Sequence, residues 1–246
     1  MIHNISHILY DLGNTLLYFD GDWEGVLLQA VEAAGKAGQR FGLSPERQAD
    51  LARSLAAQLQ AYYDRREVDL VEQQAAQIFV AALADKGISA ADRVSLDAVM
   101  RAFYSVTQHH WIAVPGAERT LARLRAQGYR QAVLSNAAHD EDVQALVDKA
   151  ALRPHLDFVL TSAALGRRKP DPQVFLRAAA DWGVPSSSVL MVGDTLAADI
   201  RGAREAGMAS VWVRKYAEEP EGDVRPDAVL ETVVELPELL SIDRPL

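Results

Sequence analysis

Four short stretches of the sequence place polar groups that can do chemistry directly after apolar runs or in loops. Asp11 follows the apolar run 8–10 and precedes the turn residues Gly13 and Asn14. Such a carboxylate stands where a strand ends and a turn begins. The comparable later positions are Ser135 with Asn136, Lys169, and Asp194 with Asp199.

The acidic residues and the lysine suit the attack of a carboxylate on a phosphoryl group. Asp11 and Asp194 can together hold Mg²⁺, because this ion prefers oxygen ligands and keeps several waters. Asp199 lies five residues beyond Asp194, and we expect it to complete or orient that set. Since nucleophile and substrate are both anions, the reaction needs fixed positive charge, which Lys169 can supply.

Ser135 and Asn136 offer a hydroxyl and an amide that can donate hydrogen bonds to phosphoryl oxygens. Taken singly, every one of these residues also has a purely structural interpretation. It can cap a turn, lie on a helix surface or be a solvated loop cation. A functional interpretation therefore requires a fold that brings them together.

The segment from residue 114 onward alternates helical and strand-like stretches, as does the start of the chain. This alternation predicts a parallel sheet covered by helices on both faces, an α/β fold of the doubly wound type. Ligands bind at the carboxyl ends of the strands in such sheets. Buried strands are expected at 8–10, 131–134, 158–160, 189–192 and 210–213, and one more short apolar run covers 228–230.

Residues 19–111 differ, because the signal there is helical throughout and the alternation is absent. Ser44 and Pro45 have the form of an N-cap followed by Pro at the first helical position. We therefore expect one α/β domain made of residues 1–18 and 112–246, interrupted by an all-helical insert at 19–111. Within residues 16–22 the apolar residues give way to a turn that is expected to act as a hinge. The four helices of the insert are expected to begin near residues 23, 45, 71 and 96.

Composition restricts the classes of function. The net charge is -9, from 34 acidic and 25 basic residues, and no Lys/Arg block occurs, so we expect no nucleic-acid partner. The absence of cysteine excludes disulfides, zinc-thiolate sites and a thiol nucleophile. The sequence has no apolar run of membrane-spanning length and does not start like a signal peptide. We expect a cytoplasmic protein that does not bind membranes; its oligomeric state is left open.

In order along the chain, these stretches resemble the four motifs of the haloacid dehalogenase superfamily. The resemblance covers nearly the whole chain, and the helical insert after the first motif is similar to the first cap type of that family. It implies that residues 1–18 and 112–246 form a Rossmann-like catalytic core and that residues 19–111 form an all-helical cap domain. It implies Asp11 and Lys169 as catalytic residues, Ser135 and Asn136 as substrate-binding residues, and Mg²⁺ held by Asp11, Gly13, Asp194 and Asp199. The matching stretches are 11–15 (DLGNT), 134–136 (LSN), 166–172 (GRRKPDP) and 193–199 (GDTLAAD).

Gly13 departs from the phosphatases of the family, which usually carry a second Asp two residues after the nucleophile. That Asp protonates the leaving oxygen, and general acid–base help of this kind is worth about 10²–10⁴-fold in rate. Hydrolytic dehalogenases lack it too, so a metal-independent 2-haloacid dehalogenase is the main rival function. The intact Gly193-Asp194 pair favours a phosphatase, because dehalogenases use no metal. Dehalogenases also tend to have an aromatic residue at the position of Gly13.

Two more kinds of function are compatible with the sequence. Phosphonate-cleaving relatives use a cap lysine, for which Lys36 and Lys86 are available. A non-catalytic homologue would keep the fold and the ligand pocket. The favoured function is Mg²⁺-dependent hydrolysis of a small phosphomonoester, such as a sugar phosphate, through an aspartyl-phosphate on Asp11. For that reaction, Asp20, Asp22 and His139 are candidates for the absent acid.

Overall fold

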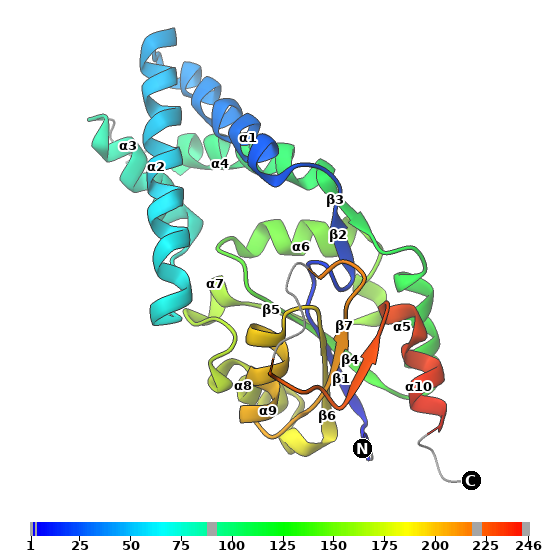
Figure 1. The fold of residues 1–246 in the computed structure, drawn as a ribbon. Coiled ribbons are helices and arrows are strands. Elements are labelled where there is room, and N and C mark those ends of the chain that lie inside the picture. The colour runs from blue at the N-terminus through cyan, green and yellow to red at the C-terminus, as the bar shows by residue number, and fades with distance from the viewer. Residues whose placement is uncertain (1, 3, 88–92, 218–222, 243–246) are drawn as a thin grey trace. The chain divides into compact units, whose positions relative to one another are not determined.

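The computed structural model describes residues 2, 4–87, 93–217 and 223–242. The chain divides into two compact units (Figure 1). One unit contains Met1–Tyr18 and Ile112–Leu246, and the other contains Phe19–Trp111.

The first unit is built on a six-stranded sheet with the strand order β5-β4-β1-β6-β7-β8. Every neighbouring pair in it is parallel. The predicted α/β fold with a parallel sheet is thereby confirmed, and the first strand of the chain lies in the middle of the sheet. The strands are β1 (His7–Tyr10), β4 (Arg130–Ser135), β5 (Phe158–Thr161), β6 (Val189–Gly193), β7 (Ala209–Val213) and β8 (Ala228–Leu230).

Helices cover both faces of this sheet (Figure 1). On one face, Leu9 and Met191 belong to a buried cluster with Phe175 of α8 and Ala203 of α9. On the other face, the Gln131 side chain donates a 2.8 Å hydrogen bond to the backbone of α5. Double coverage explains why the strands are apolar runs without alternation. The helices are α5 (Ala117–Ala126), α6 (Asp140–Lys149), α7 (Ser162–Leu165), α8 (Pro172–Trp182), α9 (Arg201–Glu205) and α10 (Leu236–Ile242), with 3₁₀ turns at Arg153–His155, Ser186–Ser188 and Val233–Glu235.

The second unit is helical, as the sequence predicts. Ser44 caps the second helix, its side chain accepting a hydrogen bond from the Arg47 backbone N–H, and Pro45 follows. Gly35 lets the first two helices approach closely, because a Cβ there would lie 2.7 Å from the Gln48 carbonyl oxygen. The third helix begins at Ala75, four residues later than expected. The elements are α1 (Trp23–Ala37), a 3₁₀ turn (Gly38–Phe41), α2 (Pro45–Asp69), α3 (Ala75–Asp85) and α4 (Arg93–His110).

Two short strands, β2 (Leu17–Phe19) and β3 (Trp111–Ala113), form a separate two-stranded sheet. The sequence prediction of apolar residues that give way to a turn did not include a strand at 17–19. These strands pair across more than ninety residues of sequence, so no local periodicity marks them. Two backbone hydrogen bonds flank this small sheet. The Asp20 N–H donates to the His110 carbonyl at 2.8 Å, and the Val114 N–H donates to the Leu16 carbonyl at 2.9 Å.

The described part of the chain contains no helix that is both long enough and apolar enough to cross a membrane.

Candidate functional site

Strand register brings three of the predicted site positions to one edge of the sheet. Tyr10 of β1 lies beside Val133 of β4 and Val192 of β6. Because parallel neighbours run in step, Asp11 follows at the level of Leu134, next to the end of β4, and of Gly193, the last residue of β6. The Asp11 N–H continues the ladder by donating a 2.9 Å hydrogen bond to the Val192 carbonyl.

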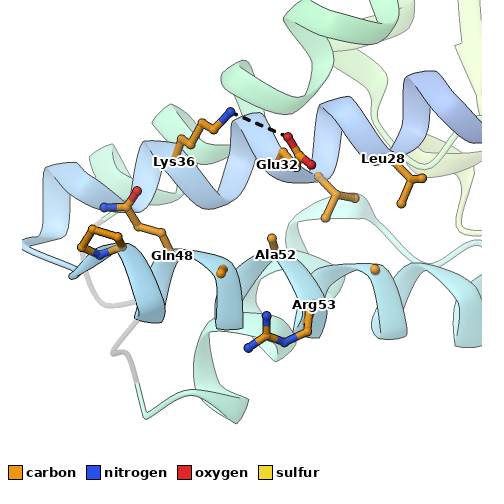
Figure 2. Close-up of a pocket in the computed structure, with 10 residues that line it drawn as sticks. Leu28, Glu32, Lys36, Gln48, Ala52 and Arg53 are labelled. Atoms are coloured by element: carbon orange, nitrogen blue, oxygen red, sulfur yellow. Dashed lines mark ion pairs between the residues drawn. The ribbon is translucent and has the colours of Figure 1, made fainter.

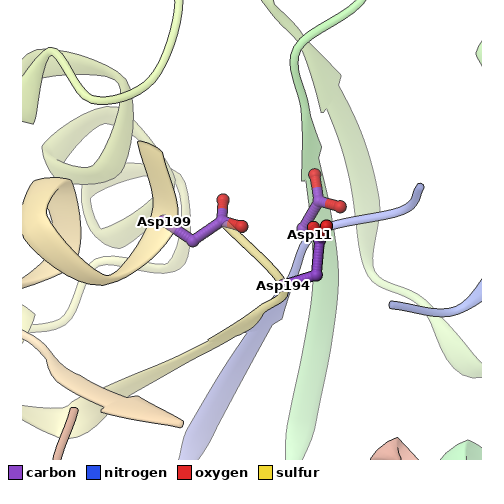
Figure 3. Close-up of side chains that lie close together, drawn as sticks. All are labelled: Asp11, Asp194 and Asp199. Atoms are coloured by element: carbon purple, nitrogen blue, oxygen red, sulfur yellow. The ribbon is translucent and has the colours of Figure 1, made fainter. Parts of the chain in front are cut away.

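Three carboxylates converge at this edge. Asp11, Asp194 and Asp199 each contribute one oxygen to a set whose members all lie within 4.8 Å of one another. Figure 3 shows Asp11 and Asp194 side by side, with the carboxylate of Asp199 pointing toward them from the turn that follows β6. All three residues are buried, with exposed fractions of 8%, 7% and 1%. Such a set of hard oxygen donors fits Mg²⁺.

Lys169 supplies the positive charge of the site. Its Nζ lies 2.5 Å from Oδ1 of Asp11 and 2.7 Å from Oδ1 of Asp199. It also donates a 2.9 Å hydrogen bond to the carbonyl of Leu134 at the end of β4. The side chain is buried, so these three oxygens replace the water that an exposed ammonium would bind. The solvated-cation interpretation of Lys169 is therefore wrong.

Burial and mutual repulsion shift the pKa values of these groups. Burial raises the pKa of Asp11 to about 6, against the opposing effect of the Lys169 charge. Burial also raises the pKa of Asp194, and the charges of Asp11 and Asp199 raise it further. The pKa of Lys169 is raised because Asp11 and Asp199 outweigh burial, which alone would lower it. One ammonium thus faces three carboxylates, and a divalent cation would relieve the excess of negative charge.

A π-helical turn at Leu196–Ile200 places Asp199. Its Oδ2 accepts a 3.0 Å hydrogen bond from the N–H of Thr195, and the Asp199 N–H donates to the Thr195 carbonyl at 2.7 Å. The turn leads directly into α9, which begins at Arg201. Turns of this kind are rare and frequently occur at functional sites.

Two residues shape the same corner, and sequence reasoning did not assign this role to either of them. Gly193 leaves room for the Asp199 carboxylate, because any Cβ at residue 193 would overlap it. Trp212 of β7 donates a 2.7 Å hydrogen bond from its indole N–H to the backbone carbonyl of Asp194. The Gly-Asp dipeptide pointed toward the first of these, whereas no sequence signal links Trp212 to Asp194.

Ser135 and Asn136 end β4 at the same edge. Ser135 is buried and lies beside Thr161 of β5. Asn136 is half-buried, and its amide makes two hydrogen bonds to the backbone of Lys169. The sequence suggests a contact to substrate for Asn136 but gives no sign of this pairing with Lys169.

The loop after Asp11 turns tightly. The carbonyl of Leu12 accepts hydrogen bonds from the N–H groups of Leu16 and Leu17 at 3.0 and 2.9 Å. Asn14 has a positive φ of 54°, whereas Gly13 does not have a positive φ. The glycine at position 13 is therefore not required by a left-handed backbone.

The candidate replacements for an acid at position 13 have structural partners. His139 Nε2 lies 3.1 Å from a carboxylate oxygen of Glu141. Asp22 caps α1, accepting a 2.9 Å hydrogen bond from the Gly25 N–H. The Asp20 N–H pairs with the His110 carbonyl. The contacts of His139 and Asp22 engage their side chains, whereas the contact of Asp20 is made by its backbone and leaves the role of its carboxylate open.

The two lysines considered for Schiff-base chemistry are ion-paired. Lys36 lies 3.7 Å from Glu32 and is exposed, and Lys86 lies 3.0 Å from Asp85. Lysines that form Schiff bases are activated by desolvation or a cationic neighbour, and these contacts supply neither. Figure 2 shows Lys36 paired with Glu32 on α1. Both residues belong to the lining of a groove of about 480 Å³ formed by α1 and α2, which is lined mainly by apolar and small side chains.

Comparisons with known proteins agree on one family. A family model described as haloacid dehalogenase-like hydrolase matches residues 5–207. Among curated proteins, a phosphoserine phosphatase of Thermus thermophilus is 39% identical over 113 residues, which are 46% of this chain and 45% of that protein. A glyceraldehyde 3-phosphate phosphatase of Pyrococcus furiosus is 33% identical over 130 residues, which are 52% of this chain and 53% of that protein. The alignments span about half the length of these relatives.

Solved structures show the same fold over nearly the full length. A 2-haloacid dehalogenase from Pseudomonas syringae pv. Tomato has a TM-score of 0.68 at 24% identity, covering 97% of this chain and 99% of its own. A HAD phosphatase from Thermococcus onnurineus has a TM-score of 0.65 at 22% identity, covering 98% of this chain and 100% of its own. At these identities the likeness establishes the fold alone.

Proposed function

This chain belongs to the haloacid dehalogenase-like hydrolase family, and we propose that it is a Mg²⁺-dependent phosphatase acting through an aspartyl-phosphate on Asp11. The proposed substrate is a small phosphomonoester such as a sugar phosphate. One observation carries the proposal: the Lys169 ammonium is buried among the carboxylates of Asp11 and Asp199, with Asp194 beside them. The curated relatives that act on small phosphorylated substrates support it.

The donor set fits a hard divalent cation. Asp11, Asp194 and Asp199 present carboxylate oxygens close together, and Gly13 has a backbone carbonyl to offer. When bound, Mg²⁺ would neutralise charge between the nucleophile and the phosphoryl group. Lys169 pairs with Asp11 and Asp199, whereas no cation lies at ion-pair distance from Asp194 in the described part of the chain, so we assign Asp194 chiefly to the metal.

The residues of the chain then have separate roles. A carboxylate oxygen of Asp11 forms the bond to phosphorus while the ester oxygen leaves, and water later cleaves the acyl phosphate to return the carboxylate and inorganic phosphate. Lys169 holds Asp11 in place and offsets charge on the phosphoryl oxygens. Ser135 donates a hydrogen bond to one of those oxygens. Because residue 13 is glycine, the leaving oxygen obtains its proton from water.

The test is a substrate screen with purified protein. Phosphomonoesters, acyl phosphates and 2-haloacids are each incubated with Mg²⁺ and with EDTA, and phosphate and halide release are measured. We expect phosphate release that requires Mg²⁺. Halide release in EDTA would instead identify a metal-independent dehalogenase, a function that also does without a second Asp at residue 13. Binding of Mg²⁺ and phosphate by calorimetry without turnover of any substrate would indicate a non-catalytic homologue.

A further inference from the structure

The side chain of Asn136 is bonded to both polar groups of the Lys169 backbone. Its Nδ2 donates a 3.0 Å hydrogen bond to the Lys169 carbonyl, and its Oδ1 accepts a 2.8 Å hydrogen bond from the Lys169 N–H. This pairing joins the end of β4 to the loop between α7 and α8 that carries Lys169. It occupies the amide oxygen and one of the two amide N–H groups.

Lys169 needs such support because its side chain is long. The four-carbon stem carries about 2 kcal/mol of rotamer entropy, and its Nζ must meet three oxygens at once, on Asp11, Asp199 and Leu134. The backbone position decides whether the stem can reach all three. The Leu134 carbonyl binds the Lys169 ammonium, and the Asn136 side chain binds the Lys169 backbone. Two residues at the end of β4 therefore position both the backbone and the charged group of Lys169.

We propose that Asn136 is a positioning residue, which acts on the reaction by fixing the backbone of Lys169. The proposal rests on the proposed function. It gives Asn136 this positioning role in place of the direct contact to substrate that the family resemblance implies. A misplacement of about 1 Å in a positioned group can cost about 10²-fold in rate. We therefore expect Asn136→Ala to lower kcat by about 10-fold to 100-fold.

A double-mutant cycle tests whether the effect passes through Lys169. Rates toward an aryl phosphate are compared for wild type, Asn136→Ala, Lys169→Ala and the double variant. If Asn136 acts through Lys169, its replacement costs less than about twofold once Lys169 is alanine. Full additivity of the two losses would overturn the proposal, as would an unchanged kcat in Asn136→Ala.

Thr161→Val is the matched control, because it removes two side-chain hydrogen bonds at the same edge of the sheet and neither involves Lys169. Thr161 donates a 2.7 Å hydrogen bond to Asp140 and accepts a 3.2 Å hydrogen bond from the Ala164 N–H. We expect this variant to lose thermal stability and keep kcat. A fall in its kcat equal to that of Asn136→Ala would show a general effect of loosening this edge, and would also overturn the proposal.

Two further measurements keep the inference testable if a variant misfolds or the enzyme acts on another substrate. Asn136→Asp keeps the acceptor for the Lys169 N–H and should retain more activity than Asn136→Ala. A crystal structure of a folded Asn136 variant should show Lys169 Nζ moved away from Asp11 Oδ1. Retention of the 2.5 Å contact in that crystal would refute the positioning role, whereas absence of phosphatase activity in the wild type would refute only the proposed function.

Discussion

A Cβ atom at Gly193 would lie 2.3 Å from Oδ2 of Asp199, so the Asp199 carboxylate packs against the backbone of residue 193. The same carboxylate accepts a hydrogen bond from the Thr195 N–H and pairs with Lys169. It cannot retreat without losing these contacts. The glycine is thus part of the site, although it contributes no side chain.

We expect Gly193→Ala to displace Asp199 and lower kcat by about 10²-fold, because displaced charges no longer match the transition state. The variant should also bind Mg²⁺ more weakly by calorimetry. Ser210→Ala, another small change at a buried position on neighbouring β7, is the control and should retain wild-type kcat. Wild-type activity in folded Gly193→Ala would mean that Asp199 can move without consequence.

Asp11→Asn should be at least about 10³-fold less active toward every phosphate ester, because an amide is a far poorer nucleophile than a carboxylate. Steady-state phosphate release measures the loss, and mass spectrometry after a rapid acid quench should detect a phosphoryl adduct in the wild type alone. Asp181→Asn, which alters a surface pair with Arg177, controls for the substitution itself. A variant that kept a tenth of the wild-type rate would exclude covalent catalysis by Asp11.

Asp194→Asn should abolish stimulation by Mg²⁺, because it removes a charged oxygen from a site with few ligands. The readout is rate against Mg²⁺ concentration, with the Kd measured separately by calorimetry. An unchanged dependence on Mg²⁺ would remove Asp194 from the metal site.

The raised pKa of Asp194, about 9 without metal, also predicts how stability depends on pH. The folded protein keeps a proton that the unfolded chain releases near pH 4, so in EDTA stability should fall as pH rises from about 4 to about 9. Asp194→Asn removes this penalty and should be more stable in EDTA at pH 8, on the order of 2 kcal/mol. Thermal unfolding across pH is the measurement, and parallel curves for the two proteins would contradict the prediction.

Gly13 predicts a strong dependence on the leaving group. With no acid beside the leaving oxygen, acyl and aryl phosphates should be cleaved much faster than alkyl phosphates, and sugar 1-phosphates faster than 6-phosphates. Because Gly13 does not have a positive φ, Gly13→Asp is compatible with the backbone. It should help alkyl esters most, by up to about 10²-fold.

The comparison is the ratio of rates for p-nitrophenyl phosphate and an alkyl phosphate in wild type and Gly13→Asp, with chemistry rate-limiting. Equal wild-type rates for the two esters would mean that another residue protonates the leaving group. Asp20, Asp22 and His139 would then be the first residues to replace.

Asp157 offers a prediction about stability away from the site. Burial tends to raise its pKa, but hydrogen bonds from Arg130, Trp182 and Arg125 lower it below its ordinary value. The Asp157 carboxylate therefore contributes to the free energy of unfolding above about pH 4. This contribution is lost as the pH falls through the pKa that Asp157 has in the folded protein. Asp157→Asn should cost about 1–2 kcal/mol at pH 7 and less at pH 3 by urea unfolding.

The control for that measurement is Asp148→Asn, because Asp148 pairs with Arg153 at an exposed position, where ion pairs contribute little. It should unfold at the wild-type urea concentration at both pH values. A loss in Asp157→Asn that did not depend on pH would show that packing, rather than charge, accounts for the effect.

The sequence was sufficient to predict the sheet and the residues at its edge. Apolar runs ended by Gly or polar residues marked the strands, and parallel strands bring their carboxyl ends to one edge, so Asp11 and Asp194 had to be neighbours. It was not sufficient for β2 and β3, which pair over a long sequence separation and carry no local pattern.

By itself, then, the sequence determined the α/β alternation, the helical interruption and the identity of the charged groups, because these depend on local periodicity and residue type. Only the tertiary structure decided what those groups contact. Lys169 is buried between two carboxylates, Asp199 packs on Gly193, and Asn136 makes hydrogen bonds to the backbone of Lys169. These contacts join segments that are distant in the chain or turns of unusual geometry. Their energies depend on distances of a few ångströms, which residue order alone does not specify.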